Sequence, residues 1–210
     1  MPGSAGVPVT ATAVIANITV TGSTAGSFVT AWPAGEAKPN ASNLNFGPGA
    51  TVANLSVVKL SNGQLSLATA VGSTHVVVDV LGYFDPATGS FFHPVAPIRI
   101  LDDRIGTGFS GPLPANTIHS LGVTGTAQVP SGATGLVANL TVTNPTTGSF
   151  VTAFPTGQVR PPSSSLNFGP GQTIPNLAMT RVGADGASSF YNQTGTVDLI
   201  ADVVGYYAAS

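Results

Sequence analysis

Short runs of alternating apolar and polar residues fill most of this 210-residue chain. Alternation with a period of two, in runs rich in Val, Ile, Thr and Phe, is typical of β-strands that bury one face. No stretch of ten residues has the apolar spacing of an amphipathic helix. The pattern predicts strands over residues 12–20, 27–32, 51–59, 64–69, 75–83, 97–101, 117–123, 134–142, 149–154, 173–181, 187–191 and 197–206.

Clusters of Gly, Pro, Asn and Ser separate the predicted strands. The sequence Phe-Gly-Pro-Gly at 46–49 and again at 168–171 is a strong turn signal. Asn62-Gly63 and Asp185-Gly186 indicate hairpin turns, because these pairs tolerate positive φ. Many short strands with regular turns predict an all-β fold of the β-sandwich or jelly-roll kind.

The chain contains two copies of one module. VIANITV at 14–20 returns as LVANLTV at 136–142, and GSFVTA and LNFGPG recur unchanged at the same offset. After a one-residue insertion near Ala184, VVVDVLGYF at 76–84 matches LIADVVGYY at 199–207. The repeat predicts two tandem β-sandwich or jelly-roll-like modules related by internal duplication, at residues 1–88 and 89–210.

Residues 91–128 have no counterpart before the first copy, which starts near Val7. This segment holds two of the predicted strands, so the first module lacks an N-terminal strand segment. Natural proteins rarely leave long sheet edges open, because open edges pair with other chains. We therefore expect the gap to be covered by the second module or by another chain, through β-augmentation. The protein is predicted to work as a homo-oligomer or within a larger assembly.

The order of motifs resembles a module repeated in secreted actinobacterial proteins. The pattern is P-x-R-I-L-D-x-R, V-x-N-x-T-V-T, a Gly-Ser-Phe strand, L-N-F and D-V-x-G-Y-Y, which covers 95–207 fully and 7–84 in part. The resemblance implies a surface module, often beside hydrolase domains, with no catalytic role of its own. One departure is Asp103, where members of the family usually carry Thr.

Charge is scarce. Charged residues make up 7 % of the chain, against about 25 % in a typical soluble domain. The net charge is −2 and the six basic residues are scattered, so no basic patch predicts a nucleic-acid partner. No apolar run approaches the roughly 18 residues of a spanning helix, so we expect no membrane insertion. The absence of Cys excludes a disulfide framework and thiol chemistry.

Low charge promotes association, and it fits an extracellular fibre, a cell surface or a virion better than a crowded cytosol. No signal peptide is visible before the first module. That is expected of a virion protein, or of a chain whose signal has been removed. We predict an extracellular, cell-surface or virion location.

No group of residues predicts catalysis. His75 matches Asp198 in the other copy, His93 and His119 lie in the unduplicated segment, and no Gly-x-Ser-x-Gly sequence occurs. A catalytic triad needs a nucleophile, a base and an orienting group together. Three histidines without paired spacing do not predict a zinc site either. We expect no enzyme activity, no cofactor and no metal.

Asp79 and Asp202 occupy the same position in the two copies, inside apolar strands. A carboxylate there is costly unless it is paired. Lys59 and Arg181, also equivalent, are the candidate partners, and Arg104 is a third for Asp202. The two carboxylates are either proton-transfer groups, or members of buried ion pairs or acceptors from loop amides that fix the fold. We favour the structural interpretation, because neither has a second catalytic group beside it, and we expect both carboxylates to be largely buried and satisfied by protein groups.

Asp102, Asp103 and Arg104 form the densest cluster of charge. The cluster is either a site for a hard cation or a sugar, or a salt bridge and turn that hold the loop before Gly106. Two carboxylates are few for a calcium site, so we favour the loop. Phe91 and Phe92 lie between the modules and are expected to fill their junction.

Two functional hypotheses follow. The first is a non-catalytic structural or interaction module on an actinobacterial surface or on the virion of an actinobacterial phage, as a decoration or tail-type protein. The alternative is a carbohydrate- or cell-wall-binding module, in which repeated Asn side chains and aromatic rings contact a surface glycan. The aromatic candidates are Trp32, Tyr83, Phe84, Tyr206 and Tyr207.

Overall fold

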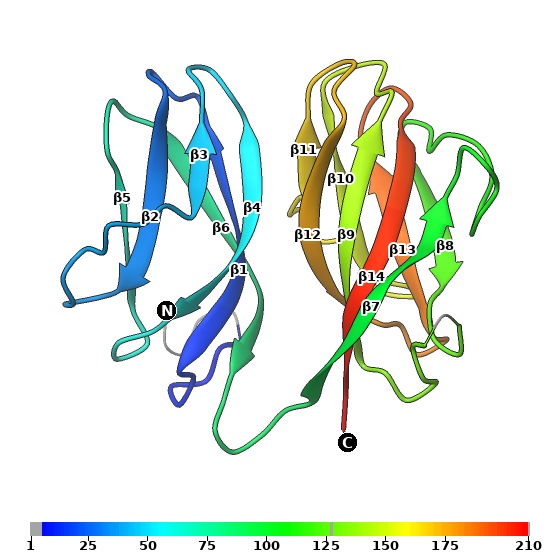
Figure 1. Ribbon diagram of the computed structural model, residues 1–210, viewed down its shortest axis with the longest axis horizontal. Helices are drawn as coiled ribbons and strands as arrows, with labels where there is room; N and C mark the ends of the chain where they lie inside the picture. The colour runs from blue at the N-terminus through cyan, green and yellow to red at the C-terminus, as the bar shows by residue number, and fades with distance from the viewer. Residues whose placement is uncertain (1–5, 127, 210) are drawn as a thin grey trace. The chain divides into compact units, whose positions relative to one another are not determined.

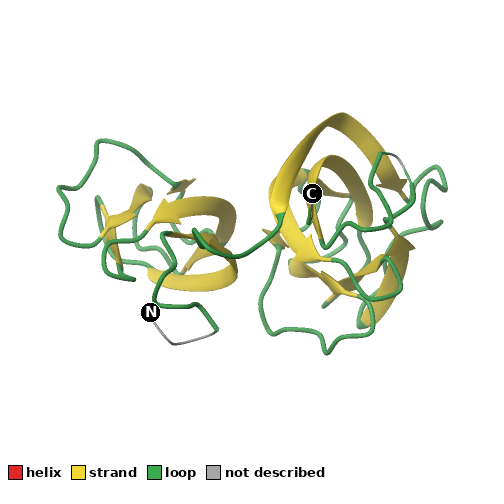
Figure 2. Ribbon diagram, turned by 90° about the horizontal axis from the view of Figure 1, so that it is seen from below, coloured by secondary structure: helices red, strands yellow, loops and turns green. Residues whose placement is uncertain are grey.

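The computed structural model describes residues 6–126 and 128–209. These residues form 14 β-strands and contain no helix, which confirms the predicted all-β class (Figure 2). The chain divides into two compact units, Met1–Gly89 and Ser90–Ser210. All the sheets are antiparallel, as expected for short strands joined by tight turns.

The second unit is a sandwich of two four-stranded sheets, with strand orders β12-β9-β14-β7 and β11-β10-β13-β8 (Figure 1). The central strands β9 and β13 are buried along most of their length, and Leu140, Leu199 and Phe190 are among the fully enclosed side chains. The strands are β7 (Phe91–Asp102), β8 (Thr117–Gly122), β9 (Gly135–Thr143), β10 (Ser149–Pro155), β11 (Leu166–Phe168), β12 (Ile174–Arg181), β13 (Ala187–Asn192) and β14 (Asp198–Ala208).

The first unit has two three-stranded sheets, with strand orders β4-β1-β6 and β3-β2-β5. β1 is the central strand of its sheet, pairs on both sides and is buried without a break from Val14 to Val20. The core is smaller than that of the second unit and is built around Val14, Ile18 and Val29. The strands are β1 (Ala13–Thr21), β2 (Ser27–Pro33), β3 (Leu44–Phe46), β4 (Val52–Lys59), β5 (Leu65–Thr69) and β6 (His75–Phe84).

The structure adds to the predicted strands in two ways. β3 and β11 are only three residues long, too short to show alternation, and the sequence analysis assigns no strand there. β7 starts at Phe91, six residues before the predicted start, although it contains Pro94 and Pro97. Proline is tolerated there because β7 is an edge strand, with β14 on one side only.

The asparagines repeated in both copies hold loops to strands. Asn54 on β4 donates its side-chain amide to the Asn43 carbonyl at 2.6 Å, and Asn176 on β12 donates to the Ser165 carbonyl at 2.7 Å. Asn45 and Asn167 donate to serine hydroxyls three residues earlier. These amides therefore have a structural use in each copy.

Candidate functional site

Each sheet of the first unit lacks one strand that the second unit has. In the second unit β7 pairs with β14 and β8 pairs with β13. In the first unit, β6 is the equivalent of β14 and β5 is the equivalent of β13. Within the described residues, each of these two strands pairs with another strand on one side only. The absent strands correspond to the segment that has no counterpart before the first copy.

The missing strands leave apolar side chains exposed. Val76 and Val77 on β6 are 37 % and 48 % exposed, whereas their counterparts Leu199 and Ile200 on β14 are 0 % and 7 % exposed. Tyr83 and Phe84, at the end of β6, are also exposed. On β5, Leu67 is partly exposed where the second unit buries Phe190. We name the outer side of β6, residues 75–84, the open edge.

The open edge has few of the features that protect natural sheet edges. Pro, Lys and inward charges commonly block pairing at such an edge. β7, the corresponding edge of the second unit, carries two prolines and Arg99. β6 carries no Pro, Lys or Arg, and Asp79 is its one carboxylate. An irregularity in register near Leu81 bends one end, but residues 75–80 pair regularly with β1. The open edge is therefore competent to pair with another strand.

In the second unit, an ion-pair network joins β7 to β14. The Arg99 guanidinium donates to both carboxylate oxygens of Asp202, at 2.9 and 3.1 Å, and to Asp102 at 3.0 Å. Arg104 donates to Asp102 twice, at 2.8 Å. The Arg104 hydrogen bonds, helped by the charge of both arginines, lower the pKa of the buried Asp102 carboxyl to about 2.

The partner of Asp202 is therefore Arg99, and the sequence-based candidates Arg181 and Arg104 are wrong. Lys59, the candidate in the first copy, is likewise wrong for Asp79. Arg181 is exposed and forms no ion pair with any described residue. Lys59 pairs with Glu36 at 3.1 Å on the surface. Arg99 was missed although it is the one basic residue within the predicted strand 97–101, because pairing between strands distant in sequence is not visible in a linear pattern.

Asp79 has no equivalent of Arg99. It lies on β6 opposite Asn17, as Asp202 lies opposite Asn139. Within residues 6–126 and 128–209, its carboxylate has no hydrogen bond or ion pair, and partial burial raises its pKa. The expectation that both carboxylates are largely buried and satisfied is thus wrong for Asp79, which is half-buried and unpaired. Asp202 is satisfied by Arg99 but is also only half-buried, so the expected burial is wrong for both residues.

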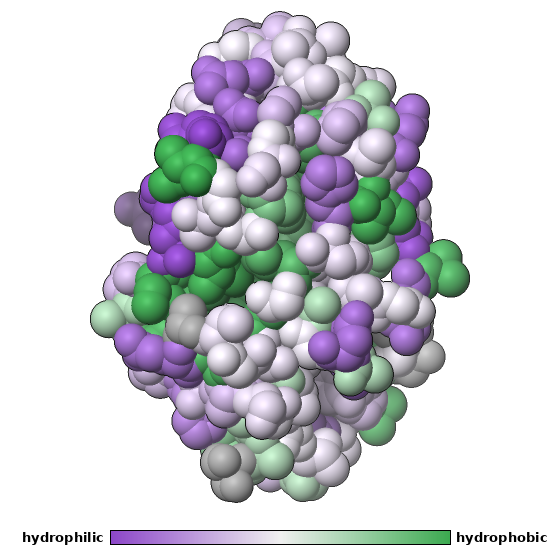
Figure 3. Space-filling view, turned by 90° about the vertical axis from the view of Figure 1, so that its right-hand side faces the viewer, coloured by the Kyte–Doolittle hydropathy of each residue, from purple (hydrophilic) through white to green (hydrophobic). Residues whose placement is uncertain are grey.

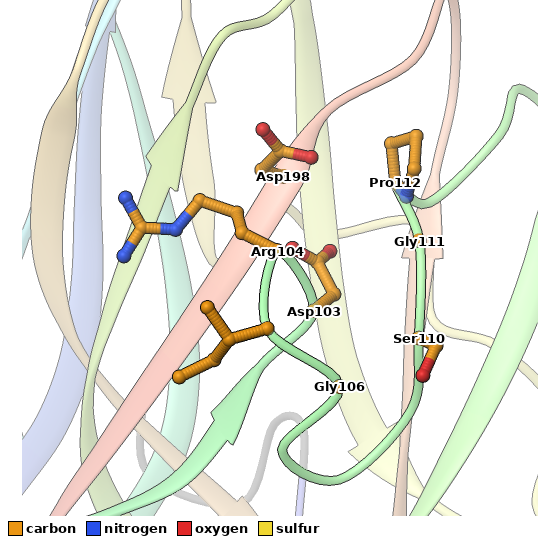
Figure 4. Close-up of a pocket in the computed structure, with 8 residues that line it drawn as sticks. Asp103, Arg104, Gly106, Ser110, Gly111, Pro112 and Asp198 are labelled. Carbon is orange, nitrogen blue, oxygen red and sulfur yellow. The ribbon is translucent and has the colours of Figure 1, made fainter.

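The loop after β7 contains a second candidate, a shallow pocket. It is lined by Asp103, Arg104, Asp198 and the backbone near Gly106 and Gly111. In Figure 4 the Arg104 side chain extends away from Asp103 and Asp198, toward the network described above. One oxygen of the buried Asp103 accepts the Leu199 amide at 2.8 Å, and the other has no partner among the described residues.

Burial, together with the charges of Asp198 and Asp102, raises the pKa of Asp103 to about 6, although the hydrogen bond from the Leu199 amide acts to lower it. The turn itself is closed by reciprocal backbone hydrogen bonds between Asp102 and Thr107. The described part of the chain contains no cluster of three or more His, Asp or Glu side chains that suits a metal ion. The loop thus places the buried Asp103 carboxyl in one pocket with the Asp198 carboxylate and beside the Asp102–Arg104 salt bridge.

The histidines and the Phe pair take part in aromatic packing. His93 stacks on Tyr206 with ring centroids 5.0 Å apart, and His119 meets the edge of Phe109 at 4.9 Å. Phe92 lies 5.4 Å from the Tyr207 ring and covers Gly205, and both Phe91 and Phe92 are exposed. Their proposed packing between the modules stays a prediction.

Comparisons with known proteins give little support for any assignment. No protein-family model and no curated protein matches the chain. A solved structure of the infectious bursal disease virus Gt strain aligns with 97 % of this chain and 68 % of that chain, at 12 % identity and a TM-score of 0.17. A superposition this poor carries no argument about fold or function. The described residues also contain no helix long and apolar enough to cross a membrane.

Proposed function

We propose that this protein is a non-catalytic structural and interaction module, exposed on an actinobacterial surface or on a phage virion. Its open edge would join it to other protein chains by strand addition. The observation that carries the proposal is the difference between β6 and β14. The two strands are equivalent, but among the residues that the structure describes only β14 has a partner on its outer side.

Two further features support an assembly role. The open edge combines an unpaired backbone with exposed valines, which is the combination used in β-augmentation. Repulsion between charges does little to oppose contact between chains, because the 210 residues include only 14 charged side chains, six basic and eight acidic. On the one face drawn in Figure 3, many residues are pale and weakly polar, a strongly hydrophobic area lies near the middle, and strongly hydrophilic residues form separate groups around it.

The location is inferred from the sequence. The resemblance to actinobacterial surface modules favours the cell surface or phages of those bacteria, and the scarcity of charge suits both. A non-catalytic role is supported by the site chemistry: His93 and His119 pack against rings, and Asp102 and Asp202 are held by arginines.

The test is light scattering on the whole chain over a concentration series. We expect the average mass to rise with concentration, and the Val77→Lys variant to abolish the rise, because a charge on the open edge opposes strand pairing. Val57→Lys is the matched control. Val57 is exposed on β4, the other edge of the same sheet, and its substitution should leave association unchanged.

A chain that stays monomeric at every concentration would contradict the proposal, as would equal association of both variants. Saturable binding to purified cell-wall glycan, unaffected by Val77→Lys, would favour the carbohydrate-binding alternative instead.

A further inference from the structure

We infer that the pocket after β7 binds one hard divalent cation of the size of Ca²⁺, held by the carboxylates of Asp103 and Asp198. Cations of this kind take about six to eight oxygen ligands from carboxylates, carbonyl groups, hydroxyls and water. The inference goes beyond the proposed function and does not depend on strand addition. It departs from the expectation of the sequence analysis that the chain binds no metal.

The buried carboxyl of Asp103 is the observation that carries the inference. Asp103 is 2 % exposed, and it lines the pocket. One of its oxygens accepts the Leu199 amide at 2.8 Å, whereas Oδ1 has no hydrogen-bond partner among the described residues. A buried acceptor without a partner is costly, and a bound ion or water satisfies it. Oδ1 is therefore available as a ligand.

Two negative charges meet at this pocket, which selects an ion over water. Asp198 lines the same pocket, and in Figure 4 the Asp103 carboxyl points from the loop toward it. The charge of Asp198 acts unfavourably on an ionised Asp103. A cation held by both carboxylates offsets that repulsion, which a water molecule or a sugar hydroxyl does not.

No described side chain supplies the positive charge. Arg104 also lines the pocket, but it donates twice to Asp102, at 2.8 Å, and extends away from Asp103 (Figure 4). Neither Asp103 nor Asp198 forms an ion pair with a described residue. The Asn144 side-chain amide donates to Asp198 at 2.8 Å, which positions that carboxylate without neutralising it.

Closure of the loop does not need the charge of Asp103. Backbone hydrogen bonds between Asp102 and Thr107 close the turn, and the Gly111 amide donates to the Asp103 carbonyl at 2.9 Å. An asparagine side chain also has an oxygen that accepts the Leu199 amide. The negative charge at this buried position thus has no structural use within the described chain, and a bound cation gives it one.

The rest of the pocket supplies neutral oxygens. Its volume of about 620 Å³ leaves space for an ion together with water. Gly106 and Gly111 line it with backbone atoms, and Ser110 adds a hydroxyl. Two carboxylates with neutral oxygens and water make a weak site, with a dissociation constant of about 10⁻⁴–10⁻³ M, as in extracellular calcium-binding modules.

The first unit does not repeat the site. His75 occupies the position of Asp198 in the first copy. An imidazole suits zinc or copper, whereas a hard cation prefers carboxylate oxygen. We therefore expect one calcium ion per chain, bound by the second unit.

The experiment is a calorimetric titration of the whole chain, treated with a chelator and dialysed, with calcium chloride as the probe. We expect saturable binding of one ion per chain. Asp103→Asn and Asp198→Asn should each bind at least about 10-fold more weakly, because even groups that only orient a ligand contribute that much to metal affinity. Glu36→Gln, which removes an exposed carboxylate from the first unit, is the control and should bind normally.

A second measurement locates the ion and checks the fold of the variants. In NMR spectra calcium should shift the backbone amides of residues 103–112 and 198–199 and leave those of the first unit unchanged. Asp103→Asn keeps the oxygen for the Leu199 amide, so its spectrum without calcium should match that of the parent. Magnesium should bind more weakly, because it loses its water reluctantly.

The absence of saturable calcium binding would overturn the inference. Equal binding by the parent, Asp103→Asn and Asp198→Asn would also overturn it, because the ion would then be held elsewhere on the surface. Neither result affects self-association through the open edge, so the proposed function would stand.

Discussion

Arg99 on β7 donates two hydrogen bonds to Asp202 on β14, from Nε at 2.9 Å and from Nη2 at 3.1 Å. The two residues are 103 positions apart in the chain and face each other in the strand register. The first unit repeats the aspartate as Asp79, but its described residues include no strand that pairs with the outer side of β6 and carries the arginine. This difference between two copies of one module is the basis of the predictions below.

Substitution of the two aspartates should have different effects on stability. Asp202→Ala should lower the free energy of unfolding of the second unit by about 1–3 kcal/mol, because Arg99 loses its bidentate partner on β14. Asp79→Ala should leave the first unit unchanged or slightly more stable, because an unpaired half-buried carboxylate is removed. Thermal unfolding of both variants measures the difference. Equal destabilisation would show that Asp79 has a partner within its own unit.

Asp103 should make the second unit less stable as the pH rises from 4 to 6. Its pKa is raised from an ordinary 3.8 to about 6, so the folded state binds the proton more tightly than the unfolded chain. That contribution is fully present below pH 3.8 and is lost as the pH rises through 6. The loss in the free energy of unfolding is at most about 3 kcal/mol, because each tenfold change in proton affinity is worth ~1.36 kcal/mol.

Asp103→Asn keeps an oxygen for the Leu199 amide and removes the titration. Chemical denaturation at pH 4, 5, 6 and 7 should show the decline in the parent protein and a nearly flat profile in the variant. Asp102 acts in the opposite direction and in a separate range, because its lowered pKa gives stability above pH 3.8 that is lost as the pH falls through 2. A parent profile that is already flat from pH 4 to 7 would contradict this account of Asp103.

The strands, turns and duplication could be read from the sequence because alternation, Asn-Gly turns and repeated motifs are local signals. The proline-containing start of β7 and the three-residue strands β3 and β11 could not, since edge position and brief pairing depend on the neighbouring strands. The gap in the first unit could be inferred from the unmatched segment. The identity of Arg99 as the partner of Asp202 required the β7–β14 register.

Gly205→Ala should destabilise the second unit by about 1–3 kcal/mol, the usual cost of overpacking. The added methyl group would displace the Phe92 ring and press on the His93 backbone. Gly122→Ala on β8 is the control, since open space surrounds a Cβ at that position. Thermal melts compare the two variants, and an unchanged melt for Gly205→Ala would show that the start of β7 does not lie against β14.

Hydrogen exchange of the backbone amides of β6, followed residue by residue by NMR, tests the open edge most directly. Residues 75–84 alternate between amides that bond to β1 and amides that point to the outer side, as in any edge strand. At the lowest protein concentration the outward amides should exchange quickly and the inward amides slowly. As concentration rises, the outward amides should become protected, and Val77→Lys should prevent this. Outward amides that are already protected in the dilute monomer, or that stay unprotected at every concentration, would contradict an edge that joins this protein to other chains.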